Sequence, residues 1–236
     1  MATIAQRVTR EETFYRRMGV GLALLILFSF GQFAARGFVD YRTVPLVVHL
    51  HAAAMLSWLG VLVTQSMLAE RLDRPMHRRL GYAGLGLALA IPPLAIATCV
   101  AALRAHAVPP FFTPAFFLAL VTLESIVFAG MVVAAVLLRR RTQWHRRLMI
   151  GSTVILLEPA FGRLLPMPLM GGWGEWVAMV LQLIAVGFIV RHDLATRREI
   201  HSATWLVAGL VVLTHVLDTA LGMTPQMAAL TGAIAG

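Results

Sequence analysis

The chain contains no lysine, and all 20 of its basic side chains are arginine. Without a lysine there can be no Schiff base to retinal, so a retinal-type photoreceptor is excluded. Charged residues make up only 13% of the 236 residues, too few to cover the surface of a soluble domain of this length. The single cysteine, Cys99, lies in an apolar segment, which excludes any intrachain disulfide.

Apolar residues make up 59% of the chain, and its mean hydropathy is +0.79. No hydrolase, P-loop, dinucleotide or histidine-box motif accompanies them. We expect an all-α, polytopic membrane protein, with a polar segment over residues 1–17 and a single transmembrane domain over residues 18–236. Because a membrane-spanning helix needs about 20 apolar residues, the apolar runs predict seven such helices. They lie at about residues 18–35, 44–68, 80–103, 114–138, 148–165, 176–190 and 203–221.

The arginines between these runs predict the orientation of the chain. Arg36, Arg42 and Arg104 fall on one side of the predicted membrane, and Arg163 falls within a run. The other 16 fall on the opposite side: Arg7, Arg10, Arg16, Arg17, Arg71, Arg74, Arg78, Arg79, Arg139, Arg140, Arg141, Arg146, Arg147, Arg191, Arg197 and Arg198. Because cytoplasmic segments are enriched in arginine, we expect a bacterial inner-membrane protein with a cytoplasmic N-terminus and a periplasmic C-terminus. On this interpretation the partner of the arginines is the lipid bilayer and not nucleic acid.

A five-residue motif occurs twice, each time after an arginine-containing loop and at the start of an apolar run. The sequence M-H-R-R-L at residues 76–80 corresponds to W-H-R-R-L at residues 144–148, 68 positions later. Proline follows at a similar depth in both runs, at residues 92–93 and at residue 159. Parallel repeats pack about an axis along the membrane normal, so we expect a four-helix core of two tandem helical hairpins. The alternative is that H-R-R is only a basic helix start at the membrane interface.

These motifs, together with H-A-x-x-M and G-V-L-x-x-Q over residues 51–65 and with Arg163-Leu164, resemble a bacterial multi-pass membrane family of unknown function. That family has H-R-x-x-G and W-H-R-x-x-M helix starts. The resemblance covers roughly residues 45–165 and implies a four-helix core but no activity. A looser likeness to cytochrome b561-type proteins implies a four-helix core with histidine ligands to haem. Ala119 stands where the repeat would place a counterpart of His51, which departs from their pattern of one histidine per core helix.

Besides histidines, the charged side chains inside the apolar runs are three carboxylates and one arginine, and each costs several kcal/mol unless it is paired. Glu124, Glu158 and Asp218 oppose the single positive charge of Arg163, a net charge of −3 + 1 = −2. The imbalance implies that carboxyl groups are protonated, that a histidine is charged, or that a cation is bound. The three carboxylates are therefore candidate metal ligands. We also expect Arg163 to form an ion pair, with Glu158 as the first candidate partner and the other two carboxylates after it.

Two histidines in the predicted outer half of the bilayer are candidate cofactor ligands. His51 shares a helix face with Met55, and a histidine and a methionine four residues apart can ligate haem or copper. His215 precedes Asp218 by three residues, and a carboxylate beside a histidine fixes its tautomer, which suits a haem or metal ligand. The alternative for both histidines is structural, as core packing for His51 and as an internal polar pair for His215.

His77 and His145 occupy equivalent positions in the repeated motif. They are candidate paired haem ligands that face each other across the axis of the repeat. The alternative is that they are interfacial histidines beside arginines whose side chains extend to the membrane surface.

These features leave three functional hypotheses. The first is a redox or metal-cofactor protein, with a b-type haem or a transition metal bound near His51 and His215. The second is a cofactor-free accessory or assembly subunit that joins other membrane subunits in a larger complex. The third is a small proton-coupled carrier that uses Glu124, Glu158 and Arg163.

The arginine distribution predicts the location of two chain positions. A reporter fused after Gly236 should report the periplasm, and a reporter fused after Arg141 should report the cytoplasm, because the arginine-rich segments stay inside. Paired fusions to alkaline phosphatase and to a fluorescent protein measure both locations. The reverse result at either position would mean that the number of spans or the orientation is wrong.

Overall fold

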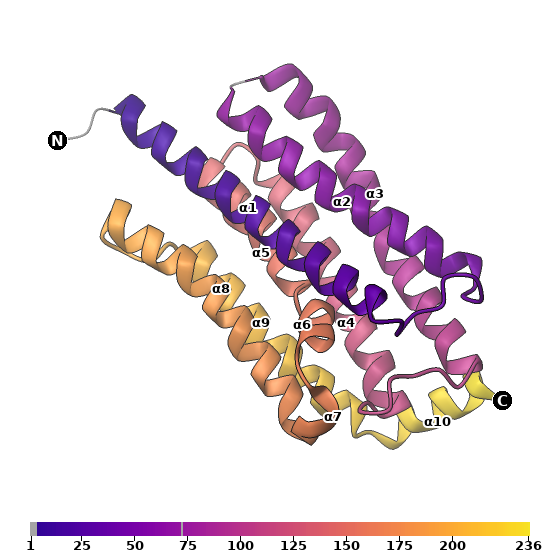
Figure 1. Cartoon of the computed structure of the whole chain (residues 1–236). Coiled ribbons are helices and arrows are strands. Elements are labelled where there is room, and N and C mark those ends of the chain that lie inside the picture. Colours follow the sequence, from indigo (N-terminus) through magenta and orange to yellow (C-terminus); the bar gives the residue numbers. More distant parts are fainter. Residues whose placement is uncertain (1–3, 72) are drawn as a thin grey trace.

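The computed structural model describes residues 4–71 and 73–236, with side chains from Glu11 onward, and every regular element in this part is a helix (Figure 1). Two arginines of the charge count, Arg7 and Arg10, fall among the side chains outside the described part. The helices are α1 Ile4–Ala35, α2 Leu46–Glu70, α3 Arg74–Arg104, α4 Pro114–Leu137, α5 Thr142–Ile155, α6 Glu158–Leu164, α7 Met167–Met170, the 3-10 helix η1 Gly171–Trp173, α8 Gly174–Arg197, α9 Ser202–Gly222 and α10 Pro225–Ala235.

Six helical segments are long and apolar enough to cross a membrane. They are Glu11–Ala35, Leu46–Glu70, Arg74–Arg104, Pro114–Leu137, Met167–Arg197 and Ser202–Gly222. Large apolar side chains are exposed along these helices, among them Leu24, Phe28 and Phe188, as expected of surfaces that face lipid. The prediction of an all-helical chain with several apolar spans is therefore confirmed.

The run predicted as a fifth continuous helix, residues 148–165, is divided in two. α5 ends at Ile155, Leu156 and Leu157 form a turn, and α6 begins at Glu158. Pro159 explains the break, because it has no amide hydrogen to donate to the carbonyl of residue 155 and its ring crowds that carbonyl. A proline inside a helix often produces only a kink, and here the structure shows a complete interruption.

Three helices begin with a capping residue followed closely by a proline. The side chains of Asp73, Thr113 and Thr224 accept hydrogen bonds from the backbone amides three residues ahead, at 3.2, 3.2 and 3.3 Å. Such side chains satisfy amides that have no partner in the first turn, where proline is tolerated. The last of these starts opens α10, a short helix that the hydropathy pattern did not predict and that packs against α3, α4 and α9.

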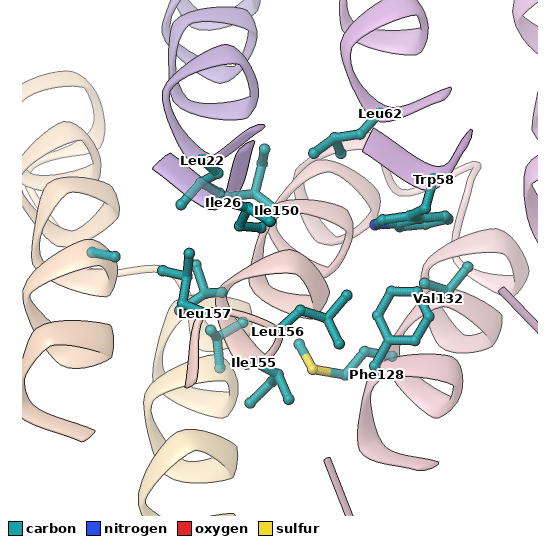
Figure 2. Packing of buried hydrophobic residues seen from close by; sticks show 14 of the residues in the cluster. Leu22, Ile26, Trp58, Leu62, Phe128, Val132, Ile150, Ile155, Leu156 and Leu157 are labelled. Atoms are coloured by element: carbon teal, nitrogen blue, oxygen red, sulfur yellow. The ribbon is translucent and has the colours of Figure 1, made fainter. Parts of the chain in front are cut away.

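The helix α5 lies at the centre of the molecule and packs against α1, α4, α8 and α9. Figure 2 shows Ile150 and Ile155 of α5 among Leu22 of α1 and Phe128 of α4, with Trp58 of α2 nearby. A Cβ atom at Gly151 would lie 2.5 Å from Cγ2 of Val207 and 2.9 Å from Cε of Met131. Glycine at this position therefore lets α5 approach α9 and α4 closely.

The two ends of the helix bundle differ in composition. The N-terminal part of α1, the C-terminal end of α2, the start of α3 and the turns at residues 138–141 and 198–201 lie at one end, which we call the arginine-rich end (Figure 1). The segment 36–45, the α3–α4 connection, α7 and α10 lie at the opposite end. The repeated H-R-R motifs are thus at the same end, as tandem hairpins require.

A fully buried ion pair joins α5 to α8 at the arginine-rich end. Arg147 and Asp193 are both 0% exposed and pair directly, and Nη1 of Arg147 also donates to the carbonyl of Gln143 at 2.9 Å. Oδ2 of Asp193 accepts from Oγ1 of Thr204 at 2.6 Å and from the amide of His201 at 3.1 Å. We call these residues the Arg147–Asp193 network. In the sequence, Arg147 is one of the 16 arginines on the predicted cytoplasmic side, and no motif there distinguishes Asp193.

His201 connects this network to the start of α9. Its Nδ1 accepts a hydrogen bond from the amide of Ala203 at 3.0 Å, which caps the helix. Burial and the nearby positive charges of Arg147 and Arg197 lower the pKa of His201, so the ring stays neutral and Nδ1 remains free to accept.

Ion pairs also attach α1 to the rest of the arginine-rich end. Arg146 pairs with Glu11 at 3.0 Å and with Glu12 at 3.1 Å, and Arg16 pairs with Glu70 at 2.9 Å. Residues 11–17 of the polar segment at the start of the chain are thus helical and packed against α2 and α5. These pairs are partly exposed, in contrast to the Arg147–Asp193 network.

The contrast between two adjacent arginines gives a stability prediction. Arg147→Ala should lower the free energy of unfolding by about 3–5 kcal/mol, because it leaves the carboxylate of Asp193 buried without a cation. Arg146→Ala is the matched control and should cost only about 0–1 kcal/mol, as partly exposed pairs do. Unfolding in mixed detergent micelles measures both. Equal stability of the two variants would contradict the structural role of the buried pair.

Candidate functional site

Four carboxyl groups from four helices meet inside the bundle, towards the opposite end. They belong to Glu124 of α4, Glu158 of α6, Glu175 of α8 and Asp218 of α9, and each residue is at most 7% exposed. Each of the four interacts electrostatically with others of the set, and Glu158 lies beside Glu175. We call these four residues the carboxyl cluster.

His215 of α9 is the basic group in direct contact with the carboxyl cluster. Its Nδ1 pairs with Oε1 of Glu175, and its Nε2 lies 2.8 Å from Oε1 of Gln182. Nε2 of Gln182 in turn donates to the carbonyl oxygen of Ile155 at 2.9 Å. This is the carbonyl that Pro159 leaves without a helical partner. The carbonyl freed by the helix break therefore orients the side-chain amide of Gln182, and that amide in turn accepts a hydrogen bond from the ring of His215.

These contacts determine which groups carry hydrogens. Because Nε2 of Gln182 donates to a carbonyl, its Oε1 must accept, so Nε2 of His215 carries the hydrogen. One further proton then lies at the contact between Nδ1 of His215 and Glu175, either on the imidazole or on the carboxyl group. The two groups lie within ion-pair distance but are not aligned as a hydrogen bond.

The remaining carboxyl oxygens of the cluster have few partners. Both oxygens of Asp218 and Oε1 of Glu158 are buried and accept no hydrogen bond among the described residues. If all groups were charged, the cluster and His215 would carry −4 + 1 = −3. Such a charge is not stable in a membrane interior, so the cluster must hold protons or a cation.

Arg163 does not neutralise the cluster by direct pairing. In the described part of the chain it forms no ion pair within 4.0 Å, although Glu158 was the expected partner. Its Nη1 donates to the carbonyl of Pro159 at 2.7 Å, and its guanidinium lies 4.0 Å from the ring centre of Phe30 and 5.4 Å from that of Phe33. Cation–π contacts with α1 thus take the place of the expected carboxylate. Glu158 acts on Arg163 only at longer range.

The histidines predicted as haem ligands have different surroundings. His51 is half-buried near Arg163, and its Nδ1 is buried without a hydrogen-bond partner in the described structure. Met55 on the same face packs against the core. His215, in contrast, has both ring nitrogens engaged, by Glu175 and Gln182, and in this arrangement neither is free to bind iron. His215 pairs with Glu175 and not with Asp218, the neighbour in sequence.

His77 and His145 lie next to each other at the arginine-rich end, far along the helices from the carboxyl cluster. Their ring centres are 6.3 Å apart. Among the described residues, no three histidine, cysteine, aspartate or glutamate side chains converge as a metal site. The roles predicted for Glu124, Glu158 and Asp218 as metal ligands stay predictions.

One member of the carboxyl cluster was missed from the sequence. Glu175 lies one residue before the helix predicted at 176–190, so it was assigned to a loop. In the structure α8 begins at Gly174, which places Glu175 inside the first turn. The available signal was its distance of seven residues from Gln182, because residues seven apart share a helix face.

Comparison of the chain with protein families, with curated proteins and with solved structures finds no match.

The contacts of Gln182 give a prediction for the site. Gln182→Leu should lower the free energy of unfolding by about 1–3 kcal/mol for each of two buried groups that lose their partner, the Ile155 carbonyl and Nε2 of His215. Gln226→Leu, an exposed position on α10, is the matched control and should unfold like the wild type. Thermal unfolding in one detergent compares them. A Gln182→Leu variant as stable as the control would show that these bonds do not hold the site together.

Proposed function

We propose that the chain is a small proton-coupled membrane carrier, in which the carboxyl cluster binds and releases protons. The observation that supports this proposal is a set of four buried carboxyl groups that act on one another electrostatically. One of them, Glu175, contacts His215, and no arginine among the described residues contacts the four directly. Like charges in a medium of low dielectric constant cannot all ionise, so the cluster retains protons at neutral pH.

The origin of the four groups explains how proton binding could be coupled to movement. They come from α4, α6, α8 and α9, and α6 is a short helix that follows the break at Leu156–Leu157. Loss of a proton adds repulsion between helices that pack side by side, and α6 is separated from α5 by the turn at Leu156 and Leu157. A change of protonation therefore favours a different spacing of these helices.

We also propose that α5 and α6 together form a seventh crossing. Residues 142–164 would extend about 35 Å at 1.5 Å per residue, enough for a hydrocarbon core of about 30 Å. The Arg147–Asp193 network supports this, because it joins the start of α5 to the end of α8. The chain between them must run to the opposite end and return. Seven crossings agree with a cytoplasmic N-terminus and with α2–α5 as two tandem hairpins.

A redox cofactor is the second candidate, and the buried, unbonded Nδ1 of His51 is the observation that favours it. Haem would require a second ligand, and His215 would first have to release Gln182 or Glu175. A bound cation in place of protons would equally neutralise the carboxyl cluster.

Infrared spectroscopy of the purified protein tests the proton hypothesis. At neutral pH the wild type should show a carbonyl stretch from protonated carboxyl groups, and Glu124→Gln or Asp218→Asn should remove part of it. Glu199→Gln, an exposed position between α8 and α9, is the control and should leave the band unchanged. The band should also change on a pH step, because a carrier must exchange its protons with water.

Metal analysis and an absorption spectrum of the same preparation separate the alternatives. Absence of a protonated carboxyl band together with bound metal or haem would replace the proton hypothesis with the cofactor hypothesis. Absence of the band in a colourless, metal-free preparation would contradict both, and would favour an accessory subunit of a larger complex.

A further inference from the structure

A pair of histidines at the arginine-rich end is independent of the carboxyl cluster. His77 lies in the first turn of α3 and His145 in the first turn of α5, at equivalent positions of the repeated motif. Their ring centres are 6.3 Å apart and their planes are inclined at 72°. The fold thus brings together two side chains that are 68 residues apart in sequence.

Each ring is fixed by the same kind of bond. Nδ1 of His77 lies 3.3 Å from the carbonyl oxygen of Gln65 on α2, and Nδ1 of His145 lies 2.8 Å from the carbonyl oxygen of Ala135 on α4. The side-chain amide of Gln65, through Nε2, also donates a hydrogen bond to the backbone carbonyl of His77 at 3.0 Å, which joins the start of α3 to α2. The two hairpins therefore hold their histidines in the same way.

These bonds determine which nitrogen is available to a ligand. A carbonyl oxygen only accepts, so Nδ1 of each ring carries the hydrogen and Nε2 keeps a lone pair. Neither Nε2 has a hydrogen-bond partner in the part of the chain that the structure describes. A main-chain carbonyl on one ring nitrogen is the arrangement that orients histidine ligands of metal ions.

We propose that His77 and His145 form a two-histidine site for a soft monovalent metal ion of the Cu(I) class. Two metal–nitrogen bonds of about 2 Å, with about 1 Å from each nitrogen to its ring centre, span about 6 Å in a linear arrangement. The observed separation of 6.3 Å matches this span. Inclined ring planes are compatible with it, because two nitrogen ligands in a linear arrangement do not require coplanar rings.

The charges around the pair favour a monovalent ion. Arg139 and Arg146 act electrostatically on His145, and no carboxylate of the described residues does. A divalent ion would be repelled more strongly and would usually need further ligands, carboxylates among them. Two neutral imidazoles suit a soft ion of low charge and low coordination number.

Anaerobic titration of the detergent-solubilised chain with Cu(I), in competition with a chromophoric Cu(I) chelator, tests the site. The wild type should withdraw one equivalent of copper from the chelator, and His77→Ala and His145→Ala should each abolish this. His49→Ala, an exposed histidine at the other end of α2, is the control and should retain the full equivalent. Failure of the wild type to compete, or retention of copper by both pair variants, would overturn the proposal.

A measurement on the unmodified chain avoids any dependence on how the variants fold. Acylation of histidines by diethyl pyrocarbonate, followed by mass spectrometry of peptides, reports each ring separately. Ag(I), which resembles Cu(I) and needs no reductant, should protect His77 and His145 together and leave His49 reactive. Protection of neither ring, or of one without the other, would rule out a shared ion. Neither result depends on protons at the carboxyl cluster. The proposed metal site can therefore be wrong while the proposed proton carrier is right, and the reverse.

Discussion

The missing amide hydrogen of Pro159 is the constraint on which the interior depends. If a residue other than proline continued the helix here, its backbone amide would donate to the carbonyl of Ile155 and Gln182 would lose its acceptor. The interruption instead leaves that carbonyl available to accept a hydrogen bond from the side chain of Gln182 on α8. The other end of the same side-chain amide then contacts His215. The interruption also turns the chain at Leu156 and Leu157 and so brings Glu158 to the start of a separate helix. One residue thus determines the direction of a polar network that extends over three helices.

The two ends of the bundle differ in how many partners their buried charged groups have. In the Arg147–Asp193 network each charged group has an opposite charge and several hydrogen-bond partners, so it holds α5, α8 and α9 in one arrangement. In the carboxyl cluster the acidic groups outnumber the basic one, and oxygens of Asp218 and Glu158 lack partners. Satisfied networks rigidify a structure, whereas a buried polar group without a partner is costly. Hydrogen bonds and an ion pair therefore hold the arginine-rich end in one arrangement, and the carboxyl cluster lacks an equivalent set of bonds.

Much of the fold and part of the site could be predicted from local sequence. Hydropathy located the apolar spans, and Pro159 located the weakness in the fifth. Glu124, Glu158 and Asp218 were noticed because a carboxylate inside an apolar run is conspicuous. Glu175 and Asp193 were missed because they lie one residue before and three residues after the predicted run 176–190, where a small boundary error turns a buried group into a loop residue.

Partners from distant parts of the chain could not be predicted in the same way. Arg163 was expected to find a carboxylate, since opposite charges attract, but the side chains within its reach are the aromatic rings of α1, some 130 residues earlier. No local pattern encodes that choice. The same holds for Arg147, whose position in a basic motif resembles that of Arg79, although Arg79 is exposed and Arg147 is enclosed.

The central position of a short helix has a consequence for biogenesis. At 14 residues and about 1.5 Å per residue, α5 is roughly 21 Å long, less than the thickness of a bilayer core. It also carries Arg147, and two of the helices that enclose it, α8 and α9, are synthesised after it. While the ribosome is still making those helices, α5 has no complete protein environment and its arginine has no counter-ion. The packing around α5 is therefore completed only after α8 and α9 have been made, and the counter-ion of Arg147 becomes available only when Asp193 of α8 has emerged.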